Sequence, residues 1–207
     1  MSFPSIHERR TFRRGVSHVS RADPRIRQLV QKHGMIEFES GGDPFESLVE
    51  AIISQQLNGQ AARMIFQRLK GSFDAEDINP KALREMHVSK LRKAGVSPQK
   101  IRYLRDLSLR IVRGQLNLGN FASKPDDEIV MALDEVKGIG PWTAHMFLLF
   151  TLGRPDILPV GDLGIQTSIK EIYSLRKLPT AEKIMEIGRN WHPYCSVASL
   201  YLWHAKE

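Results

Sequence analysis

The chain contains 207 residues, of which 30 are lysine or arginine and 23 are aspartate or glutamate, so its formal net charge is +7. Because 42% of the residues are hydrophobic and 26% are charged, the composition is close to the globular average, which excludes a disordered or collagen-like chain. The single cysteine, Cys195, excludes an internal disulfide, a four-cysteine iron–sulfur cluster and a zinc ribbon, so we expect an intracellular protein.

The N-terminal region is basic but does not look like a targeting segment. It carries four arginines: Arg9, Arg10, Arg13 and Arg14. No apolar run with a small-residue cleavage site follows them, so we expect no secretory signal. The arginines could contact phosphates or belong to a solvated tail, and the mobility common at chain ends favours the tail. The apolar run at residues 146–152 is far shorter than the roughly 20 residues of a membrane-spanning helix, so no membrane partner is expected.

Apolar residues recur at helical spacing along most of the chain and convincing strands are absent, so the sequence predicts an all-α fold. The N-terminal region is expected to hold one helix, at about residues 23–33. Asp43 and Pro44 then provide the N-cap and first turn of a core helix whose apolar positions run to Ile53. A polar break at residues 55–59 separates it from a second helix that ends near Gly71.

Further helices follow, and several begin with proline or end at glycine, as helix termini prefer. They are expected at residues 80–87, 89–94, 98–112, 125–136, 141–151, 164–174, 180–191 and 195–205. The sequence contains no internal repeat and no low-complexity linker, so it does not support a division into independent domains.

The residues around Gly138 and Gly140 predict a tight turn between two helices, one ending at Lys137 and the next beginning at Pro141. Two glycines let the backbone turn and approach a partner closely, while amide groups point outward at the start of the second helix. Such a turn can hold a phosphate. A plain helix hairpin uses the same residues, so both interpretations stay open here.

Asp162 lies in a turn just before another predicted helix, in the segment Leu158-Pro-Val-Gly-Asp162. The simplest role for this side chain is an N-cap, because aspartate accepts hydrogen bonds from the unpaired amides of a helix start. A second role is compatible with the first. An ionised, partly desolvated carboxylate can stabilise the positive charge that develops on a sugar, as in glycosidases.

Four segments together resemble the helix-hairpin-helix (HhH-GPD) DNA glycosylase superfamily, and within it the alkylpurine branch, the 3-methyladenine DNA glycosylase II enzymes. They are Leu48-Val-Glu-Ala-Ile-Ile-Ser-Gln-Gln-Leu57 with Ala61-Ala62, Val136-Lys-Gly-Ile-Gly-Pro-Trp-Thr-Ala144, Leu158-Pro-Val-Gly-Asp162, and Trp191-His-Pro-Tyr194 with Tyr201-Leu-Trp203. The resemblance runs from about Asp43 to the C-terminus. It implies one glycosylase unit over residues 1–207, with a central helical lobe at 45–152, a second lobe formed by 1–44 and 153–207, and a cleft between them.

The resemblance also implies an activity: a monofunctional DNA N-glycosylase that flips alkylated purines, such as 3-methyladenine or 7-methylguanine, out of duplex DNA and hydrolyses the N-glycosidic bond, which initiates base excision repair. Asp162 matches the catalytic aspartate. Trp142 stands where lyase members carry a Schiff-base lysine, so no lyase activity is expected. Trp203 matches an aromatic wall of the base pocket, and Met146 replaces a tyrosine of the best-described bacterial member. Both tryptophans could equally be core residues.

Contacts with DNA are implied at two places. Gln56 matches the side chain that fills the gap left by the flipped base, with Leu57 as its apolar neighbour, although a turn whose glutamines cap helix ends is the alternative. The hairpin is expected to bind a backbone phosphate through Lys137, Gly138, Ile139 and Gly140. Its carbonyl groups could also hold a monovalent cation.

No cofactor is otherwise required, and the histidines show no spacing typical of metal ligands, so no metal site is expected. The implied partner is double-stranded DNA with alkylated bases, bound by a monomer in the cytoplasm or nucleoid of a prokaryote or the nucleus of a eukaryote. The positive charge is expected to gather at the hairpin and the Gln56 loop. The alternatives are a non-catalytic relative that only binds lesions or DNA structure, and a glycosylase with lyase activity.

Overall fold

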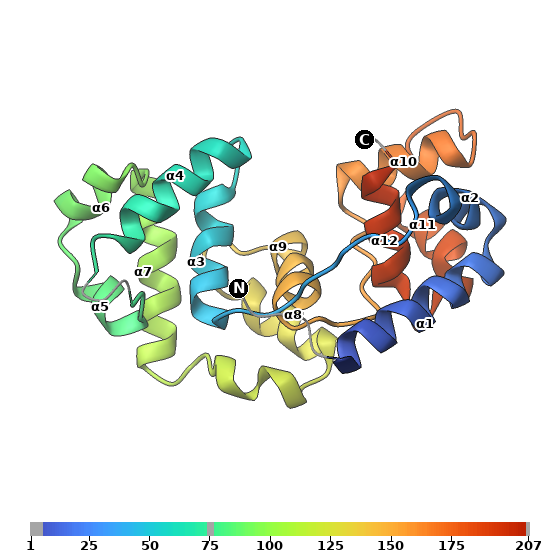
Figure 1. Ribbon diagram of the computed structural model, residues 1–207. Helices are drawn as coiled ribbons and strands as arrows, with labels where there is room; N and C mark the ends of the chain where they lie inside the picture. Colours follow the sequence, from blue (N-terminus) through green and yellow to red (C-terminus); the bar gives the residue numbers. More distant parts are fainter. Residues whose placement is uncertain (1–5, 74–76, 206–207) are drawn as a thin grey trace. The chain divides into compact units, whose positions relative to one another are not determined.

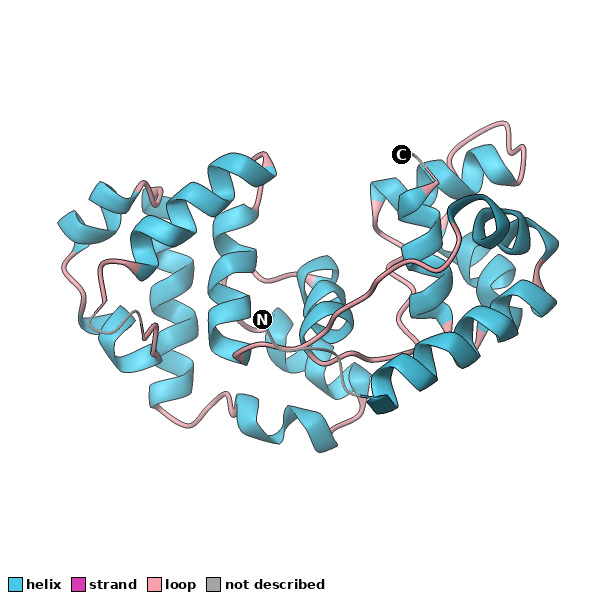
Figure 2. Ribbon diagram, viewed as in Figure 1, coloured by secondary structure: helices cyan, strands magenta, loops and turns pink. Residues whose placement is uncertain are grey.

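The computed structural model describes residues 6–73 and 77–205, and in the first helix it describes side chains from Arg10 onward. Every regular element in these ranges is helical (Figure 2), which confirms the all-α fold. No helix of the described chain is long and apolar enough to cross a lipid bilayer.

The helices form two compact units, which Figure 1 shows in the colours of the sequence. The terminal unit consists of Met1–Gly41 and Leu148–Glu207, and the central unit consists of Gly42–Phe147. These boundaries lie a few residues from those expected from the sequence, 44/45 and 152/153. Both ends of the chain therefore belong to one unit, and the continuous middle of the chain forms the other.

The central unit contains a series of short helices around an aliphatic core. They are α3 (Pro44–Ser54), α4 (Gly59–Lys70), α5 (Pro80–Glu85), α6 (Val88–Ala94), α7 (Pro98–Val112), the 3₁₀ helix η2 (Leu118–Ser123), α8 (Asp126–Asp134) and α9 (Pro141–Met146). Short polar side chains fix the starts of several of them: Asp43 accepts from the Glu46 amide at 2.8 Å, and Asn58 from the Ala61 amide at 2.8 Å. The fully buried residues include Leu48, Ile52, Ile53, Leu69, Leu83, Leu91, Leu104 and Leu107.

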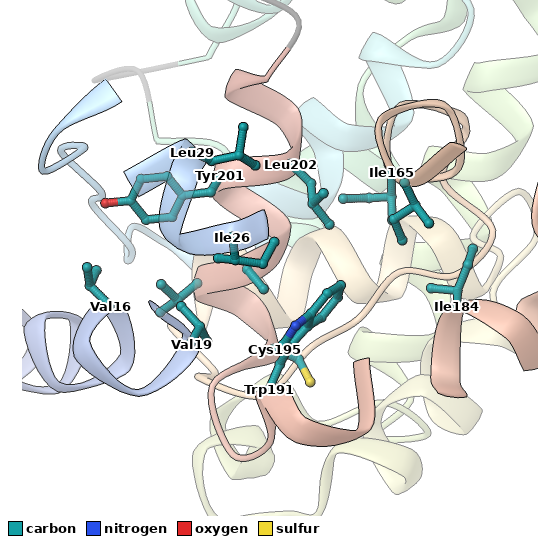
Figure 3. Packing of buried hydrophobic residues seen from close by; sticks show 13 residues of the cluster. Val16, Val19, Ile26, Leu29, Ile165, Ile184, Trp191, Cys195, Tyr201 and Leu202 are labelled. Carbon is teal, nitrogen blue, oxygen red and sulfur yellow. The ribbon is translucent and has the colours of Figure 1, made fainter. Parts of the chain in front are cut away.

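The terminal unit is built around α12 (Cys195–His204), which packs against α1 (Ile6–Ala22), α2 (Pro24–His33) and α10 (Leu163–Ile172). It also contains α11 (Ala181–Gly188), the 3₁₀ turn η4 (Arg189–Trp191) and most of the π-helical segment η3 (Phe147–Thr151). Figure 3 shows side chains from these elements meeting in one core: Val16, Val19, Ile26, Leu29, Ile165, Ile184, Trp191, Cys195, Tyr201 and Leu202.

A buried carboxylate holds the N-terminal helices to this core. Asp23 lies between α1 and α2, where one of its oxygens accepts a hydrogen bond from the Arg25 amide at 2.9 Å and so caps α2. The other oxygen accepts hydrogen bonds from the Trp191 indole at 3.1 Å and from the Tyr173 hydroxyl. Burial, together with the bond to Asp23, raises the pKa of Tyr173 well above its ordinary value. Asp23 thus connects three parts of the terminal unit that are far apart in the sequence.

Helix α1 was not predicted from the sequence, where its arginines were interpreted mainly as a tail. Gly15 lies in the middle of this helix, where glycine is unfavourable for an isolated helix. The structure gives the reason for the glycine: a Cβ atom at this position would lie 2.7 Å from Cγ2 of Val197 and 3.0 Å from Cδ1 of Tyr194. The glycine therefore allows α1 to pack closely against α12, and the interpretation as a solvated tail is wrong for residues 6–22.

Two predicted helices change their geometry before they end. The helix expected at 141–151 is α-helical only to Met146 and continues as η3. The helix expected at 180–191 ends as α11 at Gly188 and continues as the 3₁₀ turn η4. A further short helix, η2, was not predicted. The other predicted helices are present, with ends that differ by a few residues from those expected.

Candidate functional site

The loop between α3 and α4 (residues 55–58, the α3–α4 loop) presents Gln56 and Leu57 to solvent. Gln56 has a positive φ of 57°, an uncommon conformation for a residue with a side chain, and Leu57 is 40% exposed. The ammonium group of Lys100 on α7 donates to the carbonyl oxygens of Ile53 at 2.6 Å and Gln55 at 2.8 Å. Partial burial of this ammonium group lowers the pKa of Lys100. Lys100 therefore satisfies carbonyl groups at the end of α3 and fixes the start of the loop.

The hairpin (residues 137–140) is held from two sides. The Gln55 side-chain amide donates to the Gly138 carbonyl at 2.7 Å, and the Lys137 backbone amide donates to Asp106 Oδ2 at 3.0 Å. Gly138 has a φ of +82°, and a Cβ atom there would lie 2.1 Å from Cδ2 of Tyr103. This position accepts only glycine, both because of its backbone conformation and because the Tyr103 ring packs on it.

The hairpin residues differ in what they can offer a ligand. The amides of Gly138 and Gly140 have no hydrogen-bond partner among the described residues, and the Lys137 side chain is exposed. Ile139 differs from them, because its side chain is buried and its amide donates to the Val136 carbonyl at 3.0 Å. Ile139 therefore packs below the turn, and its amide is not free to bind a phosphate as the sequence predicted.

The loop and the hairpin line the same hollow, which has a volume of about 1010 Å³ and lies entirely within the central unit. Of the residues singled out in the sequence, it brings together Gln56, Leu57, Gly138, Gly140, Trp142 and Met146. Trp142 is 46% exposed, so at least part of its ring faces solvent instead of the core. Lys137 and Ile139 do not line the hollow. Gln55, Lys100 and Tyr103 also line it and were not predicted as site residues.

Asp162 forms the N-cap of α10, as expected, and has a second partner that was not expected. Its Oδ1 atom accepts a hydrogen bond from the Ile165 amide at 2.8 Å and one from the Trp203 indole at 2.8 Å. Gly164 makes room for this pair, because a Cβ atom there would lie 2.9 Å from Asp162 Oδ1 and 3.1 Å from Trp203 Cδ1. The carboxylate is thus oriented by two donors and is only partly buried.

Trp203 also stacks on Phe150, with ring centroids 5.9 Å apart and an angle of 24° between the ring planes. Phe150 in turn contacts Phe38, with centroids 6.0 Å apart, and is 41% exposed. Phe150 was not predicted as a site residue; its aromatic character and its position in the apolar segment 146–152 were its only signals in the sequence. The terminal unit therefore places an aromatic pair next to the oriented carboxylate.

The candidate residues fall into two groups. Asp162 and Trp203 belong to the terminal unit, whereas Trp142, Met146, the α3–α4 loop and the hairpin belong to the central unit. Within each group the contacts above connect the residues directly or place them around one hollow. That the two groups act on one substrate across a cleft stays a prediction.

A comparison with known families decides the wider assignment. Residues 49–193 match the model of the HhH-GPD superfamily of base excision DNA repair proteins, and this match covers most of the chain. The chain belongs to the HhH-GPD superfamily. The hairpin between α8 and α9 and the Asp162 turn both lie within the matched range.

Relatives of this HhH-GPD protein carry glycosylase names. The putative DNA-3-methyladenine glycosylase YfjP of Bacillus subtilis is 33% identical over 79% of this chain and 59% of its own length. DNA-3-methyladenine glycosylase 1 of Schizosaccharomyces pombe is 32% identical over 80% of this chain and 73% of its own length. The solved structure of the S. pombe 3-methyladenine DNA glycosylase Mag1 with abasic DNA superimposes with a TM-score of 0.83 at 29% identity, covering 93% of this chain and 96% of that one.

One group of potential metal ligands lies in the described part of this HhH-GPD chain, formed by Asp156, His192 and Cys195. Asp156 accepts hydrogen bonds from the His192 ring at 2.8 Å and from the Cys195 amide at 3.1 Å. Although partial burial opposes it, these bonds lower the pKa of Asp156, while burial and the neighbouring Asp156 raise the pKa of the Cys195 thiol. Through these hydrogen bonds, Asp156 anchors the start of α12.

Proposed function

We propose that the protein is a monofunctional alkylpurine DNA N-glycosylase that initiates base excision repair. The observation that carries the proposal is the Asp162 carboxylate, fixed at the start of α10 by the Ile165 amide and the Trp203 indole, beside the exposed Phe150 ring. Membership of the base excision repair superfamily and the names of the relatives support this assignment.

Asp162 acts on the sugar. A purine alkylated at N3 or N7 carries a positive charge, so the bond between C1′ and the purine nitrogen breaks with its electron pair returning to the base, which leaves as a neutral molecule. The sugar then develops oxocarbenium character, and the preoriented carboxylate stabilises that charge. A water oxygen adds to C1′ and loses its proton, which gives an abasic site and a free base.

The aromatic side chains select the base. The indole face of Trp203, stacked on Phe150, attracts a cationic purine by a cation–π interaction and favours 3-methyladenine or 7-methylguanine over neutral bases. The resemblance also assigns Trp142 and Met146, which line the hollow of the central unit, to the base pocket. Met146 makes this part of the pocket less aromatic than a tyrosine would, which lowers its attraction for the cation.

Water is the nucleophile, because Trp142 stands where lyase members of the superfamily carry their lysine. An indole cannot form an imine with C1′, so the abasic strand stays intact after base release. No cofactor is required for the reaction. The enzyme acts as a monomer.

Duplex DNA is held at the central unit. Gln56, with Leu57 beside it, enters the gap left by the flipped base, and the amides of Gly138 and Gly140 bind a nearby phosphate together with Lys137. A monovalent cation at the hairpin would coordinate carbonyl oxygens. The Val136 and Gly138 carbonyls each already accept one hydrogen bond, so a cation there would use their second lone pairs.

Base release tests the proposal directly. Duplexes that carry 3-methyladenine or 7-methylguanine are incubated with excess protein, and free base is measured over time. We expect the wild-type protein to release free base and Asp162→Asn to release it at least about 100-fold more slowly. The substitution removes the negative charge that stabilises the oxocarbenium character of the sugar. Asparagine is as good an N-cap as aspartate, so α10 and DNA affinity should be preserved.

Three outcomes would contradict the proposal in different ways. No base release from any lesion, with preferential binding of lesion duplexes, would establish the non-catalytic alternative. An unchanged rate in Asp162→Asn would reject the role of this carboxylate. A covalent adduct trapped with borohydride would show lyase chemistry and reject water as the nucleophile.

A further inference from the structure

The net charge of the chain is concentrated in its first two helices. Residues 1–33 contain eight lysines and arginines but only two acidic residues, a net charge of +6, whereas residues 34–207 contain 22 basic and 21 acidic residues, a net charge of +1. The central unit, with the hairpin and the α3–α4 loop, has 15 basic and 13 acidic residues. The charge excess therefore belongs to helices of the terminal unit, whereas the two places where it was expected from the sequence belong to the central unit.

Four arginines of α1 share the solvent side of that helix. Val16 and Val19 are buried in the core of the terminal unit, where α1 packs on α2 and α12. The side chains on the other side are exposed: Arg10, Arg13, Arg14 and Arg21. We name these four residues the arginine face. In Figure 1 they belong to the blue helix α1, which runs beside the red helix α12.

The geometry of the arginine face is regular. Arg10, Arg14 and Arg21 are four and seven residues apart, which places them in one row along the helix, about 16 Å long at 1.5 Å per residue. None of the four guanidinium groups forms an ion pair with another residue in the described ranges. Their charge is therefore available to an external partner.

The spacing and charge of the arginine face favour a nucleic acid as its ligand. A guanidinium group binds phosphate with two parallel hydrogen bonds, and a row of them matches the regular phosphates of a nucleic acid strand. An anionic membrane is a weaker match. Interfacial helices insert an apolar face into the lipid, and the apolar side of α1 is already buried in the protein core.

We propose that the arginine face of α1 binds the phosphate backbone of duplex DNA, as a contact separate from the hairpin and the α3–α4 loop. Because this contact is made to phosphates, it does not distinguish damaged from intact DNA. It raises the affinity for any duplex and keeps the protein close to DNA while the central unit tests for lesions. The proposal concerns DNA capture and does not depend on base excision.

The test compares two triple variants that remove the same charge. Arg10→Gln with Arg14→Gln and Arg21→Gln removes the row of three charges from the arginine face. Lys81→Gln with Lys90→Gln and Lys93→Gln removes three exposed charges from α5 and α6. Binding of an undamaged, fluorescein-labelled duplex is measured by anisotropy from about 50 to 200 mM salt, with circular dichroism to confirm equal folding. Each lost phosphate contact reduces the slope of log K against log salt by about 0.9, so the arginine variant should lose 2 to 3 units.

We expect affinity at low salt to fall about tenfold or more in the arginine variant and clearly less in the lysine variant. Equal losses in both variants would show a general effect of net charge and overturn the proposal. Loss of binding to phosphatidylserine vesicles without loss of DNA binding would overturn it in favour of a membrane. Base release is measured separately with saturating protein, so a protein that binds through α1 but releases no base would contradict only the proposed function.

Discussion

At the scale of single residues, Asp162 is held by two donors that come from different parts of the terminal unit. The Ile165 amide is three residues away in the sequence, and the Trp203 indole is 41 residues away. The first bond could be predicted, because an aspartate before a helix is a common N-cap. The second could not, because no local pattern connects residues so far apart. The indole bond restricts the rotation that a cap alone would allow.

Trp203→Phe should separate this hydrogen bond from the stacking on Phe150. The phenyl ring still packs on Phe150, but the donor to Asp162 is lost. Hydrogen bonds to charged groups contribute about 1.5–3 kcal/mol, so we expect single-turnover base release to fall roughly 10- to 100-fold. In an Asp162→Asn background the same substitution should lower the rate of base release much less, because the charged partner of the indole is absent. Equal costs in the two backgrounds would show that Trp203 acts only as a pocket wall.

Gly164→Ala tests whether the spacing of this pair matters. The new methyl group would lie 2.9 Å from Asp162 Oδ1, so the carboxylate and the indole must move apart. We expect a loss of base release of about tenfold or more, because small displacements of catalytic groups are costly. Gly161→Ala is the matched control, since no heavy atom lies within 4 Å of its added methyl group. Similar activity losses in the two variants would contradict the explanation.

At the scale of elements, the hairpin depends on Gly138 for two reasons, a positive φ and the ring of Tyr103. Gly114 has a similar φ of +70° but open space around its added methyl group, so it isolates the cost of the backbone conformation. We expect Gly114→Ala to lower the free energy of unfolding by about 1 kcal/mol and Gly138→Ala to lower it clearly more. DNA binding should weaken only in Gly138→Ala. Thermal unfolding and anisotropy measure the two effects. Equal destabilisation would show that the contact with Tyr103 is easily rearranged.

The α3–α4 loop depends on α7 through Lys100. Lys100→Met keeps most of the side-chain volume but leaves the Ile53 and Gln55 carbonyls without this donor. We expect the loop to lose its fixed geometry and base flipping to fall about tenfold, which the fluorescence of 2-aminopurine beside the lesion reports. Lys93→Met on the exposed side of α6 is the control for charge. Unchanged flipping in Lys100→Met would show that the loop orders on DNA alone.

Helix periodicity predicted most elements of this fold, because their apolar residues face a core at regular spacing. Helix α1, which was not predicted, has the same period at Phe12, Val16 and Val19. Its Gly15 is required by the close approach of Val197, a residue so far along the chain that no local sequence pattern predicts the contact. Phe150 was missed for a similar reason. Its role comes from Trp203, which lies on another helix. Resemblance to a family supplied the roles of Asp162 and Gln56, but it did not supply the side chains that orient them.

At the scale of the whole molecule, net charge and ligand-binding residues are distributed differently. The hairpin and the loop lie in a unit with almost balanced charge, whereas the first two helices carry nearly all of the excess. The sequence total of +7 could not distinguish these arrangements, because α1 was not expected to be a helix with one basic side. A charge sum is informative only once it is known which faces of the elements are exposed.

The buried state of Cys195 has a practical consequence for measurements on this protein. The thiol is fully enclosed in the core of the terminal unit, and burial and Asp156 raise its pKa, so the native chain has almost no reactive thiolate. Maleimide reagents should therefore leave the folded protein unlabelled and react only after denaturation. A cysteine introduced at the exposed position Ser17, between Arg14 and Arg21, would then be the one labelled site. A fluorophore there would report DNA contact with α1 without any cysteine having to be removed.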